Sequence, residues 1–90
     1  MRADKDKTVQ LIKTARGQLE GIIKMIEEDR YCVDISHQLL AVNAIIRKAN
    51  NNVIKGHLEG CVKEALESDN EERKGDMLKE VYGLIDDLSK

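Results

Sequence analysis

Several residue types that build turns and sheets are scarce in this chain of 90 residues. It has no proline, tryptophan or phenylalanine, only 6 glycines, and two tyrosines as its aromatic residues. Because hairpins and tight turns depend on glycine and proline, this scarcity disfavours a β-rich fold and favours long helices. The length predicts one small domain over residues 1–90 and excludes a two-domain enzyme.

Signals for membrane insertion and export are also missing. No apolar run reaches the roughly 18 residues that cross a bilayer, and residues 1–7 contain no apolar stretch of the kind found in export signals. We therefore expect a cytoplasmic protein with no membrane partner. In that reducing compartment Cys32 and Cys61 are not expected to form a disulfide by default, which leaves a buried thiol, a metal ligand or a redox sensor.

Motifs for enzymatic chemistry are absent as well. The chain has no glycine-rich phosphate loop and no Ser/His/Asp set, and its paired carboxylates lie only in charge runs that we expect to be exposed. We therefore expect neither enzymatic activity nor a small-molecule substrate.

The net charge of −2 conceals an uneven distribution along the chain. Residues 1–24 hold six basic and three acidic side chains, whereas residues 64–90 hold four basic and nine acidic ones. The near-neutral total therefore averages a basic head with an acidic tail. The head could contact phosphates, or it could be only a solvated helix face.

Apolar residues recur at three- and four-residue steps in three segments. This pattern predicts helices over about residues 5–27, 32–66 and 76–88, joined by a short connection and by a polar loop over 68–75. The fold class is therefore all-α, a three-helix protomer with one long central helix of roughly 50 Å. Because the core of so small a domain is marginal, we expect oligomerisation. Gly17 and Gly21 share one face of the first helix, which indicates the close approach of a second helix.

The long helix carries three candidate metal ligands. His57 and Cys61 are four residues apart, so their side chains lie on one helix face about 5–6 Å apart. On spacing alone, packed core residues remain an alternative explanation for this pair. Cys32 lies 25 residues before His57, or about 37 Å along a straight helix, so one chain cannot bring all three to one ion.

An antiparallel pair of central helices resolves this separation. Placing Cys32 opposite His57 and Cys61 of the partner puts a two-fold axis near residues 44–46 and gives a four-helix dimer with two equivalent sites. The apolar residues that this pairing would bury against their symmetry mates are Leu39, Val42, Ile46 and Val53. Two thiolates and one imidazole suit Cu(I) best and Zn(II) second, since Zn(II) normally takes a fourth ligand. His37 points about 140° away from Cys32 and is expected to be a surface or structural residue.

Several segments resemble the copper-sensitive operon repressor (CsoR) family, which also includes nickel/cobalt, formaldehyde and persulfide sensors. The similar segments are Gly17-Gln18, Gly21-Ile22, residues 25–35 and residues 57–62. The resemblance implies a dimer of antiparallel helices that pairs into a homotetramer, binds operator DNA in the apo form and releases it on binding Cu(I). The implied ligands are Cys32, His57 and Cys61.

The comparison of branches favours copper. Nickel-type members carry an additional N-terminal histidine, whereas the first histidine of this sequence is His37. Formaldehyde sensors use an N-terminal proline, whereas residue 2 here is arginine. Persulfide sensors usually lack the histidine at the position of His57. The resemblance also implies that Tyr31 lies beside the metal site and that a glutamate of the third helix joins it. The family's usual spacing places that glutamate at Met77, whereas a longer loop favours Glu80.

DNA contacts transfer less directly from the family. Many members begin the first helix with several arginines where this chain has Leu11, Thr14 and Glu20. The remaining candidates for phosphate contacts are Lys13, Arg16, Lys24, Arg47 and Lys48.

Three functional hypotheses follow from the sequence. The leading one is a Cu(I)-responsive transcriptional repressor. The second is a thiol- or persulfide-sensing repressor that switches through Cys32 and Cys61 of the partner subunit. The third is a structural dimerisation module in which these residues only fill the core.

Overall fold

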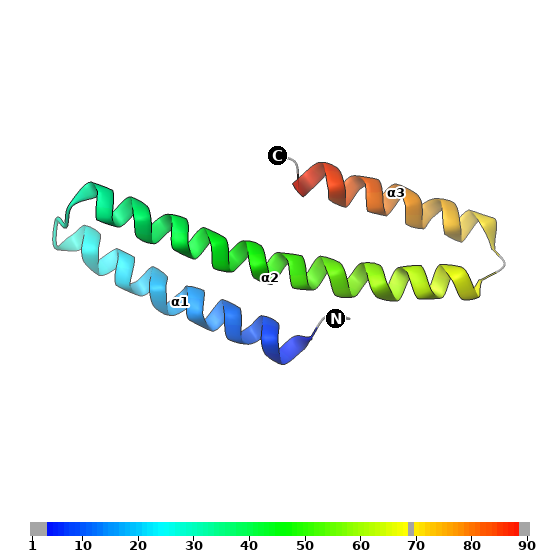
Figure 1. Cartoon of the computed structure of the whole chain (residues 1–90), viewed down its shortest axis with the longest axis horizontal. Coiled ribbons are helices and arrows are strands. Elements are labelled where there is room, and N and C mark those ends of the chain that lie inside the picture. The colour runs from blue at the N-terminus through cyan, green and yellow to red at the C-terminus, as the bar shows by residue number, and fades with distance from the viewer. Residues whose placement is uncertain (1–3, 69, 89–90) are drawn as a thin grey trace.

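The computed structural model describes residues 4–68 and 70–88, and within these residues the chain forms three α-helices and no strand. The helices are α1 (Lys5–Glu27), α2 (Cys32–Glu67) and α3 (Glu71–Leu88), which confirms the all-α expectation. α1 runs antiparallel along the first half of α2, and α3 runs antiparallel along its second half on the other side (Figure 1). The principal extents of 60 × 27 × 13 Å correspond to a single layer of helices.

Local hydrogen bonds fix the beginning of α1. The carboxylate of Asp4 caps the helix by accepting the backbone N–H of Lys7 at 3.1 Å. The Thr8 hydroxyl donates to the carbonyl oxygen of Asp4 at 2.8 Å. This bond explains why a polar residue with only 7% of its surface exposed is tolerated there.

The turn between α1 and α2 is a Schellman motif with an aspartate in the left-handed position. Asp29 has φ 54, the Asp29 N–H donates to the Ile26 carbonyl at 3.1 Å, and the Arg30 N–H donates to the Met25 carbonyl at 2.9 Å. Aspartate is one of the few non-glycine residues that adopt this conformation readily. The tight reversal leaves Cys32 as the first residue of α2.

The predicted loop over 68–75 and the predicted start of the third helix at residue 76 were wrong, because α3 begins at Glu71. The side-chain oxygen of Asn70 accepts the backbone N–H groups of Glu72 and Arg73 at 3.0 and 3.3 Å. Asparagine is a favourable N-cap, and acidic residues in a first turn interact well with the helix dipole. The polar residues that suggested a loop are therefore those that begin a helix. α2 ends at Glu67, one residue beyond its predicted end.

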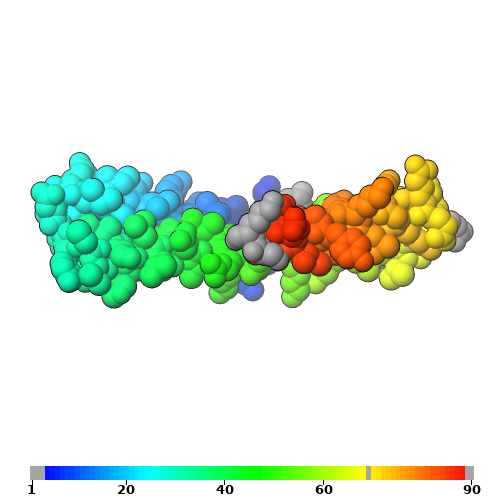
Figure 2. Space-filling view, turned by 90° about the horizontal axis from the view of Figure 1, so that it is seen from above, coloured from blue at the N-terminus to red at the C-terminus, as the bar shows by residue number. Residues whose placement is uncertain are grey.

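The hydrophobic core is small and lies between α1 and α2. Ala15, Ile22 and Val42 form a buried cluster, with Ile35 and Ile45 packed against it. No residue of α3 is buried. The radius of gyration is 18.1 Å, whereas a compact domain of this length would have roughly 12 Å. Figure 2 shows the same extended shape from above, with α3 covering only the second half of α2.

One sequence expectation about packing faces was wrong, and a second is not met within a single chain. Val42, predicted to face its symmetry mate, is already buried against α1 within one chain and is 2% exposed. Gly17 and Gly21 were expected to mark the close approach of a second helix, but within this chain a Cβ added at either would meet nothing within 4 Å, because α1 contacts α2 through its other face, which carries Ala15. Close approach by a helix of another subunit stays a prediction.

Candidate metal centre

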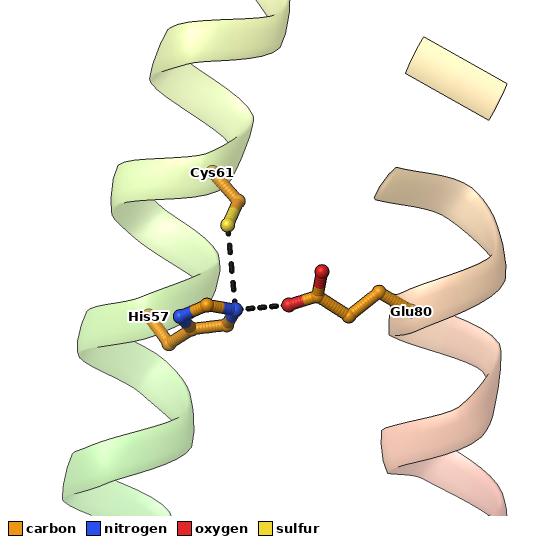
Figure 3. Close-up of side chains that lie close together, drawn as sticks. All are labelled: His57, Cys61 and Glu80. Carbon is orange, nitrogen blue, oxygen red and sulfur yellow. Dashed lines mark hydrogen bonds and ion pairs between the residues drawn. The ribbon is translucent and has the colours of Figure 1, made fainter. Parts of the chain in front are cut away.

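Three potential ligands from two helices converge at one point between α2 and α3. His57 and Cys61 project from α2 toward Glu80 of α3 (Figure 3). The Cys61 Sγ lies 3.4 Å from His57 Nε2, and the same ring nitrogen contacts Oε1 of Glu80. One donor atom from each residue lies within 4.8 Å of the other two. The cluster therefore presents nitrogen, sulfur and oxygen donors around one space.

The cluster is open to solvent on one side. The side chains of His57 and Glu80 are 44% and 47% exposed, and Cys61 is a half-buried free thiol. Because the donors are accessible, a metal ion or a thiol reagent can reach them without opening the helices.

An ion pair at the surface links α3 to α2. Arg73 of α3 forms an ion pair of 2.8 Å with Glu64 of α2, one turn beyond Cys61. Between the helices is a hollow of about 140 Å³. Its lining residues are Cys61, Glu64, Ala65, Arg73, Asp76, Met77 and Glu80. This register brings Glu80, two turns after Arg73, to the His57 ring.

The structure distinguishes the two third-helix positions considered from the sequence. Glu80 contacts the His57 ring, and Met77 lines the same hollow as Cys61 and Glu80. Glu80 was the candidate that required a longer loop between the second and third helices. Its contact with His57 is thus observed, and its part in a response to metal stays a prediction.

Cys32 and Tyr31 lie at the other end of α2 from this cluster. Cys32 is an exposed free thiol and the first residue of the helix. Tyr31, which precedes it, is 68% exposed. Within one described chain, Cys32 does not join the group of His57, Cys61 and Glu80. A ligand set with two thiolates therefore needs a second chain.

The candidate DNA-contacting residues are exposed and lie on two helices. Three stand on α1 and two near the middle of α2: Lys13, Arg16, Lys24, Arg47 and Lys48. Arg47 also lines a groove to which the C-terminal end of α3 contributes Asp87 and Leu88. Their contact with DNA stays a prediction. In the part of the chain that the structure describes, no helix is long and apolar enough to span a membrane.

Comparisons with known proteins agree on one protein family. Residues 4–87 match the family model described as metal-sensitive transcriptional repressor. A copper-sensing transcriptional repressor CsoR of Mycobacterium ulcerans is 49% identical over 55 residues, covering 61% of this chain and 47% of the relative. A Bacillus subtilis protein of the same name is 35% identical over 79 residues, covering 88% of this chain and 78% of the relative. The chain spans about half the length of the mycobacterial CsoR relatives, 47% to 56%.

Solved structures agree with this assignment. The copper-sensing repressor CsoR with Cu(I) from Geobacillus thermodenitrificans NG80-2 superposes with a TM-score of 0.81 at 28% identity, covering 100% of this chain and 93% of the other. The nickel-responsive regulator InrS has a TM-score of 0.79 at 23% identity, covering 92% and 93%, which shows a shared fold. With the family model matching nearly the whole sequence, this chain belongs to the metal-sensitive transcriptional repressors, a family of regulators and not of enzymes.

Proposed function

We propose that this chain is a Cu(I)-responsive transcriptional repressor, which binds operator DNA in the apo form and releases it on binding Cu(I). The observation that carries the proposal is the open pair formed by His57 Nε2 and Cys61 Sγ, 3.4 Å apart. An imidazole and two thiolates form a soft set of few ligands that suits Cu(I). The relatives named as copper-sensing repressors support the same assignment.

The partner subunit would supply the missing thiolate, from its own Cys32. At 3.6 residues per turn, Cys32, Leu39, Ile46 and His57 fall within about 40° of one another around α2. Leu39 and Ile46 are 45% and 43% exposed in the single chain. A second α2 laid antiparallel on this face would cover both apolar side chains and bring Cys32 to the partner's His57 and Cys61. The proposed assembly is this dimer, paired further into a homotetramer.

Closure of the ligands around one ion would link the site to the rest of the protein. Cu(I), when bound, supplies a centre that favours a compact set of thiolate and imidazole ligands. Cys32 begins α2, so drawing it toward the partner's His57 moves the start of that helix and the adjacent Tyr31. Glu80 contacts His57, so a change in the ring position reaches α3. By linkage, the factor by which metal lowers DNA affinity equals the factor by which DNA lowers metal affinity.

DNA binding would rest on many weak phosphate contacts. The candidates are the exposed side chains Lys13, Arg16, Lys24, Arg47 and Lys48. A single chain carries few of these charges, but a tetramer presents four copies of each. Because counterion release adds over all phosphate contacts, affinity should fall steeply with salt.

The test uses DNA that the protein itself selects. The apo protein first enriches a binding sequence from a pool of random duplexes, and fluorescence anisotropy then measures its affinity with and without Cu(I). We expect Cu(I) to weaken DNA binding by roughly 5- to 150-fold, the usual range of allosteric coupling. His57→Ala should retain DNA binding and lose the response to Cu(I). His37→Ala, which replaces an exposed histidine outside the cluster on the same helix, should behave as the unmodified protein.

One result would contradict the proposal directly. X-ray absorption of the copper-loaded protein can show whether the ion has two sulfur ligands and one nitrogen ligand. If that site is filled and DNA affinity is unchanged, copper is bound without serving as a signal.

A thiol switch is the second candidate, favoured by the fact that Cys32 and Cys61 are both free and Cys32 is exposed. A persulfide would oxidise Cys32 of one chain and Cys61 of its partner to a disulfide and would itself be reduced to a thiol and hydrogen sulfide. Non-reducing mass measurement distinguishes this mechanism, because it requires a covalent dimer. The histidine between the two thiols has no role in such a bridge, which favours copper.

A further inference from the structure

The Nε2 atom of His57 contacts both Sγ of Cys61 and a carboxylate oxygen of Glu80 in the same chain. This set of donors bears on which metal ion the cluster can bind. We propose that His57, Cys61 and Glu80 form a zinc(II) site within one protomer, in which Glu80 is a direct ligand. This site shares two residues with the proposed copper site but replaces the partner's cysteine with a carboxylate of α3. Zinc binding at these residues does not depend on the proposed function. Only the effect of zinc on DNA binding rests on that function.

The separation of the sulfur and nitrogen donors suits tetrahedral zinc. With Zn–S of about 2.3 Å and Zn–N of about 2.0–2.1 Å, tetrahedral angles separate the sulfur and nitrogen by about 3.6 Å. The observed separation of Cys61 Sγ and His57 Nε2 is 3.4 Å. Glu80 already contacts this nitrogen, and the three donor atoms all lie within 4.8 Å of one another. The three donors are therefore gathered around one point, and the half-exposed side chains of His57 and Glu80 have room to adjust around an ion.

The exposed side of the cluster leaves room for a fourth ligand. Because the His57 and Glu80 side chains are 44% and 47% exposed, water can complete a tetrahedron there. Zinc accepts sulfur, nitrogen and carboxylate oxygen together, and three protein ligands with one water are a common arrangement.

Ligand hardness separates the two metals. Carboxylate oxygen is a hard donor that zinc accepts and a poor ligand for Cu(I), which selects thiolates. Thiolates also suit zinc, but Glu80 already contacts the His57 ring within the same chain. The same His57–Cys61 pair would take Glu80 when zinc is bound and the partner's Cys32 when Cu(I) is bound.

Binding of the two metals would consequently affect different parts of the protein. Glu80 stands on α3, a helix that buries none of its residues, so a zinc bond to it would fasten this helix to α2. Cys32 stands at the start of α2, so Cu(I) would act on the subunit interface. On the proposed function, zinc then occupies the sensing pair without releasing DNA. The site would discriminate between metals by geometry as well as by affinity.

The experiment compares the affinities of the two metals in matched variants. Competition with a chromogenic zinc chelator and with a Cu(I) chelator gives both constants for the unmodified protein, Glu80→Gln and Asp76→Asn. Asp76 is the matched control, an acidic residue that lines the same hollow one turn earlier on α3 but lies outside the ligand cluster. We expect Glu80→Gln to lower the affinity for zinc by a factor about ten or more times larger than the factor by which it lowers the affinity for Cu(I). Asp76→Asn should leave both unchanged.

A second variant and a second readout separate this proposal from the copper function. Cys32→Ser should retain zinc binding and lose Cu(I) binding. In amide hydrogen exchange, zinc should slow exchange in α3 of the unmodified protein and not in Glu80→Gln.

The possible failures are distinguishable. If Glu80→Gln weakens both metals equally, Glu80 acts only by orienting His57 and the zinc site is overturned, while Cu(I)-dependent release of DNA is unaffected. If Cys32→Ser loses zinc as well, zinc uses the intersubunit set and the single-chain site is again overturned. If Cu(I) leaves DNA affinity unchanged while zinc binding depends on Glu80, the repressor mechanism fails and the zinc site stands.

Discussion

Ile46→Glu tests the proposed dimer at its most sensitive position, because the proposed two-fold axis passes near residues 44–46. Fully burying an isoleucine side chain contributes about 1.5–3 kcal/mol, and Ile46 has 43% of its surface exposed in the single chain. Covering that surface is therefore worth about 1 kcal/mol per subunit and about 2 kcal/mol for the two copies. Its loss raises the dimer dissociation constant roughly 30-fold. Repulsion between two carboxylates facing each other near the axis adds to this effect.

Sedimentation velocity over a dilution series measures the dissociation constant directly. Ala41→Glu is the control, since Ala41 is exposed on the same helix but points about 140° away from Ile46. It introduces the same charge and should leave assembly unchanged. Because Cys32 would come from the partner, Ile46→Glu should also lose Cu(I) affinity at concentrations where the chain is monomeric.

Two outcomes would refute the antiparallel pairing. If Ile46→Glu assembles as the unmodified protein does, the apolar face of α2 is not the interface. If the variant is monomeric and still binds Cu(I) through two sulfurs and one nitrogen, the site does not need a partner.

Further predictions concern the helix cap, a glycine and the phosphate contacts. Asn70→Ala removes the cap of α3 and should destabilise that helix by about 1 kcal/mol, seen as faster amide exchange in its first turn; unchanged exchange would contradict the capping role. Gly17→Ala meets no atom within 4 Å in the single chain, so it should raise stability by up to about 1 kcal/mol in thermal unfolding; a loss of stability would contradict this and show that another subunit packs against that face. Arg16→Gln should reduce the slope of log DNA affinity against log salt by about 1 for each phosphate that Arg16 neutralises, and an unchanged slope excludes Arg16 from the interface.

The first two helices were predictable because their signals are local. The segments predicted over 5–27 and 32–66 are found as Lys5–Glu27 and Cys32–Glu67. Apolar residues recur at helical spacing along the whole of both segments. The start of α3 was not predictable from the composition of residues 68–75, because polar residues of the same types favour both loops and first helical turns. Asn70 followed by two glutamates was the capping signal that could have revealed it.

The faces of the helices were harder to predict than the helices themselves. Val42, Leu39 and Ile46 all belong to the same apolar pattern, yet Val42 is buried by α1 while the other two remain exposed. Periodicity identifies which residues are apolar and on which side they lie. It does not decide which neighbour covers each part of a wide apolar face.

For the candidate metal centre, the sequence alone determined that His57 and Cys61 lie side by side and that Cys32 of the same chain cannot reach them. Both statements follow from the rise and turn of one α-helix. Only the tertiary structure decided that Glu80, and not Met77, meets the His57 ring. That choice depends on where α3 begins and on how it slides along α2, which the cap at Asn70 and the Arg73–Glu64 ion pair help to fix. The register between two helices is set by the contacts between them. It therefore cannot be predicted from the apolar periodicity of either helix alone.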